Sequence, residues 1–407
     1  MGENPKIAYL VPQFPGQTHI FFWREINELR KRGVDLSVLS TRPPPSGLIS
    51  HSWSAEAMAN TKYLGQPAPI ATLQALFSLP LRSLMTEIRS EGAAVVQDAV
   101  LCLSSARRLA RHCAANGIDH VHVHSCGRAA LIAALANRMT GLSYSLTLHG
   151  PIADYGAGQG FKWRRAAFAS VITKTLLDQA RQALGRDMPA EVVVQSMGVD
   201  TDSFARKSAY RSAAPGERVM IFSCGRLNAA KGHQDLLQAI RQLVNEGMDV
   251  GLEIAGEDDV GGQGFRAVIE ATIRDLQLTD RVKLLGAVNE AEVRRRLMEA
   301  HIFALASWQE PLGVAYMEAM SCEVPTIGTD AGGVRELITD GEDGILVPPR
   351  DPVALAGAIR TLVEQPELAK KISLAGRERV VAAFRSSLGA ETLITEIERL
   401  RSRGRVR

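Results

Sequence analysis

The order of secondary structure in this chain is clearest in residues 219–255, which read VMIFSCGRLNAAKGHQDLLQAIRQLVNEGMDVGLEIA. The apolar run at 219–223 predicts a buried strand, and Gly225 predicts a turn after it. Residues 232–246 then repeat apolar side chains at helical spacing, before residues 250–255 return to a strand pattern. Strand, turn, helix and strand in this order form a βαβ unit, which implies a parallel sheet covered by helices.

The same order recurs on both sides of this stretch. Towards the C-terminus, strand patterns at 282–285, 302–306 and 325–328 alternate with helical patterns. At the N-terminus, a strand pattern at 7–11 is followed by apolar residues at helical spacing and by a second strand pattern at 34–39. We therefore expect an α/β protein made of two Rossmann-like, doubly wound domains that face each other across a cleft.

Domain boundaries follow from the same patterns. We predict an N-terminal domain over residues 1–205, a C-terminal domain over 206–385 and a last helix over 386–407 that packs on the N-terminal domain. Ligands of open α/β sheets bind beyond the carboxyl ends of the strands. The loops after Val11, Ser223, Leu285 and Ala306 are therefore where we expect the chemistry.

Residues 41–115 fit the alternation poorly and are predicted to be a helical insertion in the first domain. They begin with three prolines and become rich in arginine, for example at Arg89, Arg107, Arg108 and Arg111. Such a surface is either a solvated helix face or a surface that meets anionic lipid or a lipid-linked acceptor. The sequence leaves both interpretations open.

Composition narrows the class of protein. The 407 residues are 46% hydrophobic and 22% charged, as in ordinary globular proteins, and the net charge of +3 gives little support to nucleic-acid binding. The five cysteines are odd in number and scattered, which is typical of a reducing cytoplasm. No apolar run approaches the 18 residues of a membrane span; the nearest covers 129–136. We expect a cytoplasmic protein, with peripheral contact at the inner face of the membrane as the alternative.

Two cations follow the first strand of the second half. Arg226 and Lys231 lie in the segment 224–232, between a predicted strand and the start of a predicted helix. A helix N-terminus offers free N–H groups and the positive end of its dipole. Arginine binds phosphate as a fork and lysine as a point charge. The two side chains are therefore well placed to hold a diphosphate without a metal.

Two carboxylates flank a second helix start. Glu310 is predicted in the loop after the 302–306 strand, and Glu318 on the following helix. Their separation suits contacts to different hydroxyls of one extended ligand better than a hydrolase pair, whose carboxyls flank a single bond at about 5–10 Å. Between them, Gly313 and Val314 mark N–H groups that are free to bind phosphate.

The motif from Glu310 to Glu318, followed by AMSCEVP at 319–325 and GGVRE at 332–336, resembles the family-4 retaining glycosyltransferases of the GT-B fold. The resemblance is continuous over about residues 219–363. The N-terminal half is similar more loosely, most of all to bacterial exopolysaccharide (colanic-acid-type) glycosyltransferases, through FPG at 14–16, DHVHVH at 119–124 and LHGPIADY at 148–155. Pro311 and Leu312 stand where the family often has Gly-Phe, so the sugar is left unassigned.

The resemblance implies a role for each matched residue. Arg226 and Lys231 would bind the diphosphate of a nucleotide-sugar donor and stabilise the leaving group. Glu318 would bind the ribose and Glu310 the donor sugar, and His149 would lie beside the reacting sugar. The backbone of the remaining positions would contact phosphate, sugar or nucleobase: Gly16, Gly286, Leu312, Gly313 and Val314.

Histidines and aspartates also suggest metal sites. His120, His122 and His124 alternate on a predicted strand and share one face, which is poor geometry for tetrahedral coordination. We interpret them as structural, with His124 as a candidate for facing the site. The Asp200-Thr201-Asp202 motif lies in a stretch that resembles the interdomain segment of the family. We therefore expect no metal or other cofactor.

The predicted function is a metal-independent, retaining glycosyltransferase that moves a sugar from a nucleotide-diphosphate donor to a glycan or lipid-linked acceptor in polysaccharide biosynthesis. A nucleotide-sugar epimerase or hydrolase of the same fold, or a non-catalytic nucleotide-sugar-binding scaffold, stays open as an alternative. A P-loop or a dehydrogenase is excluded, because neither GxxxxGK[ST] nor GxGxxG follows a strand.

Overall fold

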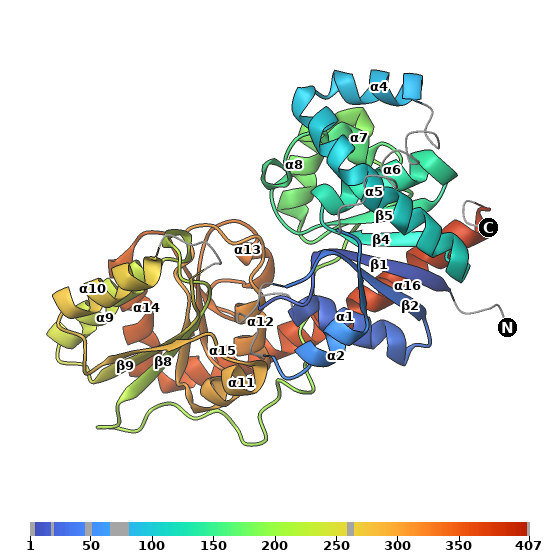
Figure 1. The fold of residues 1–407 in the computed structure, drawn as a ribbon. Coiled ribbons are helices and arrows are strands. Elements are labelled where there is room, and N and C mark those ends of the chain that lie inside the picture. The colour runs from blue at the N-terminus through green and yellow to red at the C-terminus, as the bar shows by residue number, and fades with distance from the viewer. Residues whose placement is uncertain (1–4, 18–19, 45–50, 66–80, 259–263, 405–407) are drawn as a thin grey trace. The chain divides into compact units, whose positions relative to one another are not determined.

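The computed structural model describes residues 5–17, 20–44, 51–65, 81–258 and 264–404, and they divide into two compact units. Of these described residues, the first unit holds those up to Ser196, apart from His51 and Ser52, and those from Ser387 on. The second unit holds His51, Ser52 and the described residues from Met197 to Ser386. Each unit is built around its own parallel sheet with helices on its faces (Figure 1).

Within the described residues, the sheet of the first unit has seven parallel strands in the order β3-β2-β1-β4-β5-β6-β7. Residues 7–11 of the central strand are completely buried, which agrees with the need of a parallel sheet for apolar strands on both faces. The strands are β1 (Lys6–Gln13), β2 (Asp35–Arg42), β3 (Thr61–Tyr63), β4 (His120–His124), β5 (Ser143–Leu148), β6 (Ala169–Val171) and β7 (Val192–Val194).

Helices cover both faces of this sheet, with α5 and α6 on one side and α1 on the other (Figure 1). The apolar run 129–136 forms the buried middle of α6, because α6 packs between the sheet and α5. The helices are α1 (Ile20–Lys31), α2 (Ser54–Ala59), α4 (Leu81–Ser90), α5 (Ala93–Asn116), α6 (Arg128–Thr140), α7 (Gln159–Trp163) and α8 (Lys174–Leu184), with 3-10 turns η1 (Ile152–Tyr155) and η2 (Gly185–Asp187).

The segment predicted as a helical insertion, about residues 41–115, contains a strand that the sequence analysis did not predict. The segment does contain α2, α4 and α5, but Thr61–Tyr63 form β3, which pairs in parallel with β2 at the edge of the sheet. Only Thr61 of this strand is buried, while Lys62 is exposed. Three residues at a sheet edge are too few to show a strand pattern in sequence. Residues 45–50 and 66–80 of the predicted insertion lie outside the described residues.

The last helix, α16 (Ser386–Ser402), packs on the first unit. Arg32 of α1 pairs with Glu391 at 2.8 Å, and Arg401 approaches Asp119, which precedes β4, at 3.4 Å. Between these ends, a Cβ placed on Gly389 would lie 2.6 Å from Glu25 Oε1 on α1. The helix therefore lies directly against α1.

Within the described residues, the second unit has a six-stranded parallel sheet in the order β10-β9-β8-β11-β12-β13. Its strands are β8 (Val219–Cys224), β9 (Val250–Ala255), β10 (Val282–Gly286), β11 (Ile302–Ala304), β12 (Thr326–Thr329) and β13 (Ile345–Val347). Its helices are α9 (His233–Asn245), α10 (Phe265–Asp275), α11 (Glu290–Glu299), α12 (Val314–Ser321), α13 (Val334–Leu337), α14 (Pro352–Glu364) and α15 (Pro366–Ala383), with the 3-10 turn η3 (Ala229–Lys231).

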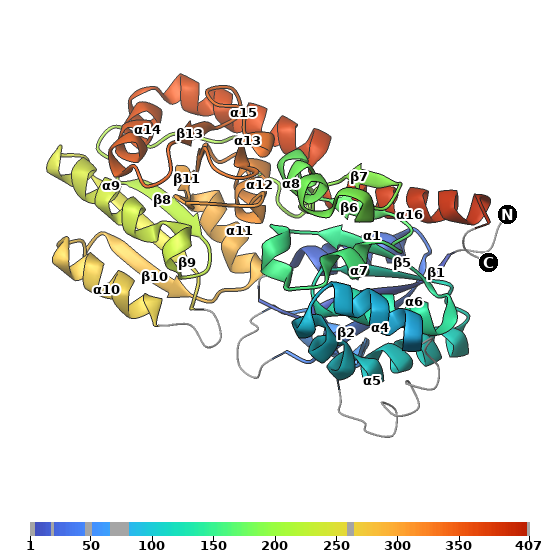
Figure 2. The ribbon, with the colours of Figure 1, turned by 90° about the horizontal axis from the view of Figure 1, so that it is seen from above.

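The predicted helix after the first strand of this unit is confirmed as α9. Its apolar positions Leu236, Leu237, Ile240 and Leu243 are completely buried in the core of the unit. Figure 2 shows α9 and α10 side by side.

The topology explains why distant segments meet. Strands β8 and β11 are parallel neighbours, with Phe222 opposite Phe303. Their carboxyl ends lie at the same edge of the sheet, so the loops that follow them, 225–232 and 305–313, emerge side by side.

Candidate active site

An ion pair joins the two loops at this edge of the second sheet. Lys231 ends η3, after β8, and Glu310 lies in the loop between β11 and α12; their side chains pair although the residues are 79 positions apart. The two side chains are only 16% and 12% exposed, and the Ser307 hydroxyl donates to Glu310 Oε2 at 3.1 Å. The structure thus brings together two predicted site residues and adds Ser307, which the sequence analysis missed.

A glycine allows the two loops to approach closely. Gly232 has a φ of 67°, and a Cβ at this position would lie 1.9 Å from the carbonyl oxygen of Ala306. Any side chain here would therefore push the Lys231 turn away from the loop after β11. The Trp308 backbone N–H donates to the Ala230 carbonyl at 2.8 Å, and this hydrogen bond joins the same two segments.

Trp308 forms a second connection that the sequence did not reveal. Its indole N–H donates to Asp235 Oδ2 at 2.6 Å, and the guanidinium of Arg350 lies 4.1 Å from the centre of its ring. The indole is partly buried, and Asp235 in the first turn of α9 supplies the hydrogen-bond partner that its N–H needs. Trp308, Asp235 and Arg350 lie far apart in the sequence, and no sequence pattern connects them.

The second predicted carboxylate, Glu318, lies on α12 and is 7% exposed. Burial, together with the nearby charge of Glu318, raises the pKa of the Cys224 thiol at the end of β8 to about 12. Glu318 therefore lies near the carboxyl end of the central strand.

The start of α12 lies between the two carboxylates. Leu312 is buried, and Gly313 directly precedes Val314, the first residue of the helix. The first N–H groups of an α-helix have no partner within the helix, so this end can bind an anion. A hydrogen bond also holds the loop that precedes α12 in place, because the Gly333 backbone N–H donates to the Glu310 carbonyl at 2.9 Å.

Two further predicted residues lie at the same edge of the sheet. Arg226 is exposed just beyond β8, and its carbonyl lies 3.2 Å from His233 Nε2. Gly286 ends β10, two strands away from β8, where its carbonyl accepts from the Gly256 N–H at 2.9 Å. The ion pair between Arg266 and Glu257, at 2.8 Å, lies nearby.

The other two predicted residues belong to the first unit. Gly16 is buried in the segment after β1, and His149 directly follows β5. His149 Nε2 lies 3.2 Å from Nδ1 of His124, the last residue of β4. Gly16 and His149 therefore lie beyond the carboxyl ends of β1 and β5, the two strands that flank β4 in the sheet, where the fold predicts ligand contacts.

The three alternating histidines have different surroundings. His120 and His122 are buried, and they lie within hydrogen-bond distance of hydroxyls on the neighbouring strand β5. Those hydroxyls belong to Ser143, Ser145 and Thr147. His124 is the exception, because its ring reaches His149. Burial lowers the pKa of His120 and of His124 to about 3, so both rings are neutral.

The aspartates of the Asp200-Thr201-Asp202 motif serve a turn. Oδ1 of Asp200 accepts from the N–H groups of Asp202 and Ser203 at 3.1 and 3.0 Å. Among the described residues, no group of three or more histidine, cysteine, aspartate or glutamate side chains is arranged to hold a metal ion.

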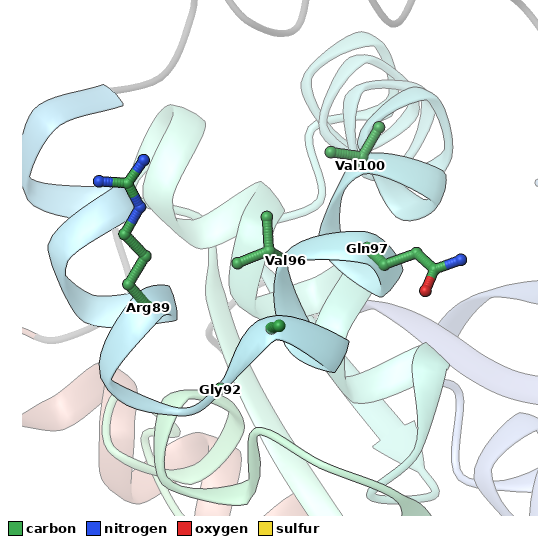
Figure 3. Close-up of a pocket in the computed structure, with 6 residues that line it drawn as sticks. Arg89, Gly92, Val96, Gln97 and Val100 are labelled. Atoms are coloured by element: carbon green, nitrogen blue, oxygen red, sulfur yellow. The ribbon is translucent and has the colours of Figure 1, made fainter.

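A shallow hollow of about 490 Å³ lies between α4 and α5 of the first unit (Figure 3). Its lining mixes apolar and polar side chains, including Arg89, Val96, Gln97 and Val100. Val100 and the adjacent Leu101 are 54% and 61% exposed. Within the part of the chain that the structure describes, no helix is long and apolar enough to cross a membrane.

Comparison with known proteins gives a glycosyltransferase family for each half of the chain. Residues 19–198 match the family described as "Glycosyl transferase 4-like domain", and residues 206–379 match "Glycosyl transferases group 1". The alpha-D-kanosaminyltransferase of Streptomyces kanamyceticus is 27% identical over 295 residues, which cover 67% of this chain and 74% of that protein. The amylovoran biosynthesis glycosyltransferase AmsK of Erwinia amylovora is 32% identical over 52% of each chain.

The fold is shared with solved structures. That of Anabaena HepE in complex with UDP and glucose superposes with a TM-score of 0.74 at 18% identity, over 97% of this chain and 99% of that one. The arrangement of two parallel sheets with interleaved helices is that of GT-B proteins. The chain therefore belongs to the family-4-type glycosyltransferases of the GT-B fold.

Proposed function

We propose that this glycosyltransferase moves a sugar from a nucleotide-diphosphate donor to a glycan or lipid-linked acceptor, with retention of configuration and without a metal. The observation that carries the proposal is the contact of Lys231 with Glu310 at the start of α12. A cation, a carboxylate and a helix N-terminus within one small region suit a ligand that has both phosphates and sugar hydroxyls. The relative AmsK, named for amylovoran biosynthesis, supports a place in polysaccharide assembly.

The phosphate end of the donor is assigned to the positive groups. Lys231, the exposed Arg226 and the N–H groups of Leu312, Gly313 and Val314 would contact the diphosphate. In the transition state these groups would stabilise the negative charge that develops on the leaving phosphate. In metal-dependent enzymes a bound metal ion supplies this stabilisation. On this basis we propose a metal-independent reaction.

The other end of the donor is assigned to the carboxylates. Glu318 would accept hydrogen bonds from the ribose and Glu310 from the transferred sugar, while the turn at Gly286 would lie near the base. From the first unit, Gly16 would contact the diphosphate and His149 the reacting sugar. The surroundings of Glu310 support its assignment, because Lys231 and Ser307 hold its carboxylate in a fixed position.

Retention is proposed to occur by attack on the face that the phosphate leaves. The bond between the anomeric carbon and the phosphate oxygen breaks, and its electron pair stays on the phosphate. The acceptor oxygen bonds to the same face of the carbon, and its proton passes to the leaving phosphate. The ion-paired state of Glu310 favours a binding role over that of a covalent nucleophile.

Saturation-transfer NMR against UDP-, GDP-, ADP- and dTDP-sugars tests the donor site. We expect one nucleotide class to bind the wild-type protein and to lose most of its signal in Lys231→Ala. An acceptor-independent release of free nucleotide would instead favour an epimerase or hydrolase. If none of the sugars binds, the result contradicts a donor site for these four nucleotide classes and favours a scaffold or a donor outside this set.

The proposed setting is the cytoplasmic face of a membrane, with contact through α4 and α5. The exposed Val100 and Leu101 lie beside a hollow lined by Arg89, and apolar side chains beside arginine suit an anionic lipid surface. We expect the double variant Val100→Glu, Leu101→Glu to lose flotation with phosphatidylglycerol-containing vesicles. Val353→Glu, at a valine of the second unit that is 66% exposed, should float like wild type. Equal flotation of both variants, or none for wild type, would contradict this contact.

A further inference from the structure

A chain of four polar side chains runs through the first unit and ends at His149. The Tyr9 hydroxyl donates to Glu25 Oε2 at 2.5 Å, and Nε2 of His124 lies 2.9 Å from the same oxygen, a close contact that lacks the geometry of a hydrogen bond. His124 Nδ1 then lies 3.2 Å from His149 Nε2. The members come from β1, α1, β4 and the end of β5, so only the tertiary structure assembles them.

Glu25 is an unusual residue for its position. It is 6% exposed on a helix whose neighbouring side chains Phe22, Ile26 and Leu29 form core. The backbone of α16 covers its other oxygen, because a Cβ on Gly389 would lie 2.6 Å from Oε1. Burial raises the pKa of Glu25, which means that folding opposes its charge. Burying a carboxylate lowers the stability of the fold unless the charge is paired, and an apolar side chain would fill a core position such as this one without that loss.

The distances indicate where the protons lie. The Tyr9 hydroxyl donates to Glu25 Oε2, and this hydrogen bond stabilises the carboxylate form and lowers the pKa of Glu25 against the effect of burial. At 2.9 Å, the lone pair of a bare His124 Nε2 would repel that carboxylate, so Nε2 carries a proton. Burial lowers the pKa of His124 to about 3, so its ring is neutral and its Nδ1 carries none.

The same reasoning extends to His149. Two ring nitrogens at 3.2 Å can share one proton, and because His124 Nδ1 has none, His149 Nε2 must donate it. A neutral His149 then has its lone pair on Nδ1. The rings of Phe21 and Phe22 pack beside the His149 imidazole, with ring centres 5.5 and 5.6 Å from its own, so the surroundings of the imidazole are partly apolar.

We propose that Glu25 is a positioning residue which, through His124, fixes His149 in the tautomer that has its proton on Nε2 and accepts hydrogen bonds at Nδ1. The inference rests on the proposed function, because it gives His149 the part of an acceptor for a hydroxyl of the sugar or of the acceptor. Glu25 itself touches neither substrate.

The chain offers a matched control for this role. His120 lies on the same strand and the same face as His124 and is equally buried. Its partners are the hydroxyls of Ser143 and Ser145, and its pKa is also lowered by burial, to about 3. A change at His120 therefore disturbs the same core without touching the link between Glu25 and His149.

Long-range ¹H–¹⁵N spectra of ¹⁵N-histidine-labelled protein test the proposal directly. In wild type we expect His149 to be protonated on Nε2 alone. Glu25→Met removes the carboxylate at similar volume, and His124→Phe removes the link. Both should leave His149 as a mixture of tautomers, whereas His120→Phe should leave its signals unchanged. A wild-type His149 protonated on Nδ1, or signals unchanged in both variants, would overturn the proposal.

Kinetics provide a second measurement. We expect kcat to fall about tenfold or more in Glu25→Met and His124→Phe, while the KM for the donor stays within about twofold, because the assigned donor-binding groups are elsewhere. A rise in donor KM at constant kcat would contradict a role at His149. If no donor supports transfer by the wild type, the proposed function fails, but the spectra still decide the tautomer.

Discussion

Replacing Lys231 by alanine is expected to lower the rate of sugar transfer about 100-fold or more, as does removal of one preorganised donor to a developing oxyanion. The Lys231 side chain extends from the end of η3, just before α9, and is 84% buried, with its ammonium group against Glu310 and its backbone fixed by the Gly232 turn. No other lysine occurs in the 224–232 segment that could replace it. Steady-state rates with the donor identified by NMR measure the effect.

The control for this experiment is Lys371→Ala, at an exposed lysine on α15 of the same unit. It removes the same charge from the protein far from the loops after β8 and β11, so its rate should equal that of wild type. A Lys231→Ala rate within threefold of wild type would remove Lys231 from the site.

Replacing Glu310 by glutamine is expected to lower the transfer rate by a similar factor, about 100-fold. The substitution keeps the shape and the contact with Ser307 but removes the charge that pairs with Lys231. Because the two side chains touch, their effects should not add. The transfer rate of the double variant Lys231→Ala, Glu310→Gln should therefore be about equal to that of the less active of the two single variants.

Glu253→Gln is the matched control for Glu310. The Glu253 carboxylate is 15% exposed and pairs with Arg296 at 2.5 Å in the same unit, so its loss removes an equally buried ion pair away from the site. Its rate should stay near that of wild type below the melting temperature. Fully additive losses in the Lys231 and Glu310 variants would show that the two side chains act independently.

Local sequence was sufficient for most of the fold. The apolar runs at 7–11 and 219–223 and the helical spacing of α9 depend only on neighbouring residues, because a parallel strand or an amphipathic helix buries a fixed periodic set of its own side chains. The same holds for a cation or a glycine beside a predicted strand end, which is why Lys231 and Gly225 could be identified from the sequence. The edge strand β3 was missed, because three residues carry no period.

Tertiary structure alone decided which side chains meet. The contact of Lys231 with Glu310 spans 79 residues and exists because β8 and β11 are neighbours in the sheet, although they are separated in sequence by β9 and β10. Trp308 finds Asp235 for the same reason. Glu25 is the clearest case. In sequence it is one charged residue on a helix, and only the packing of α1 between the first sheet and α16 buries its carboxylate beside His124. Strand order is set by pairing between distant segments, and no periodicity within one segment records it.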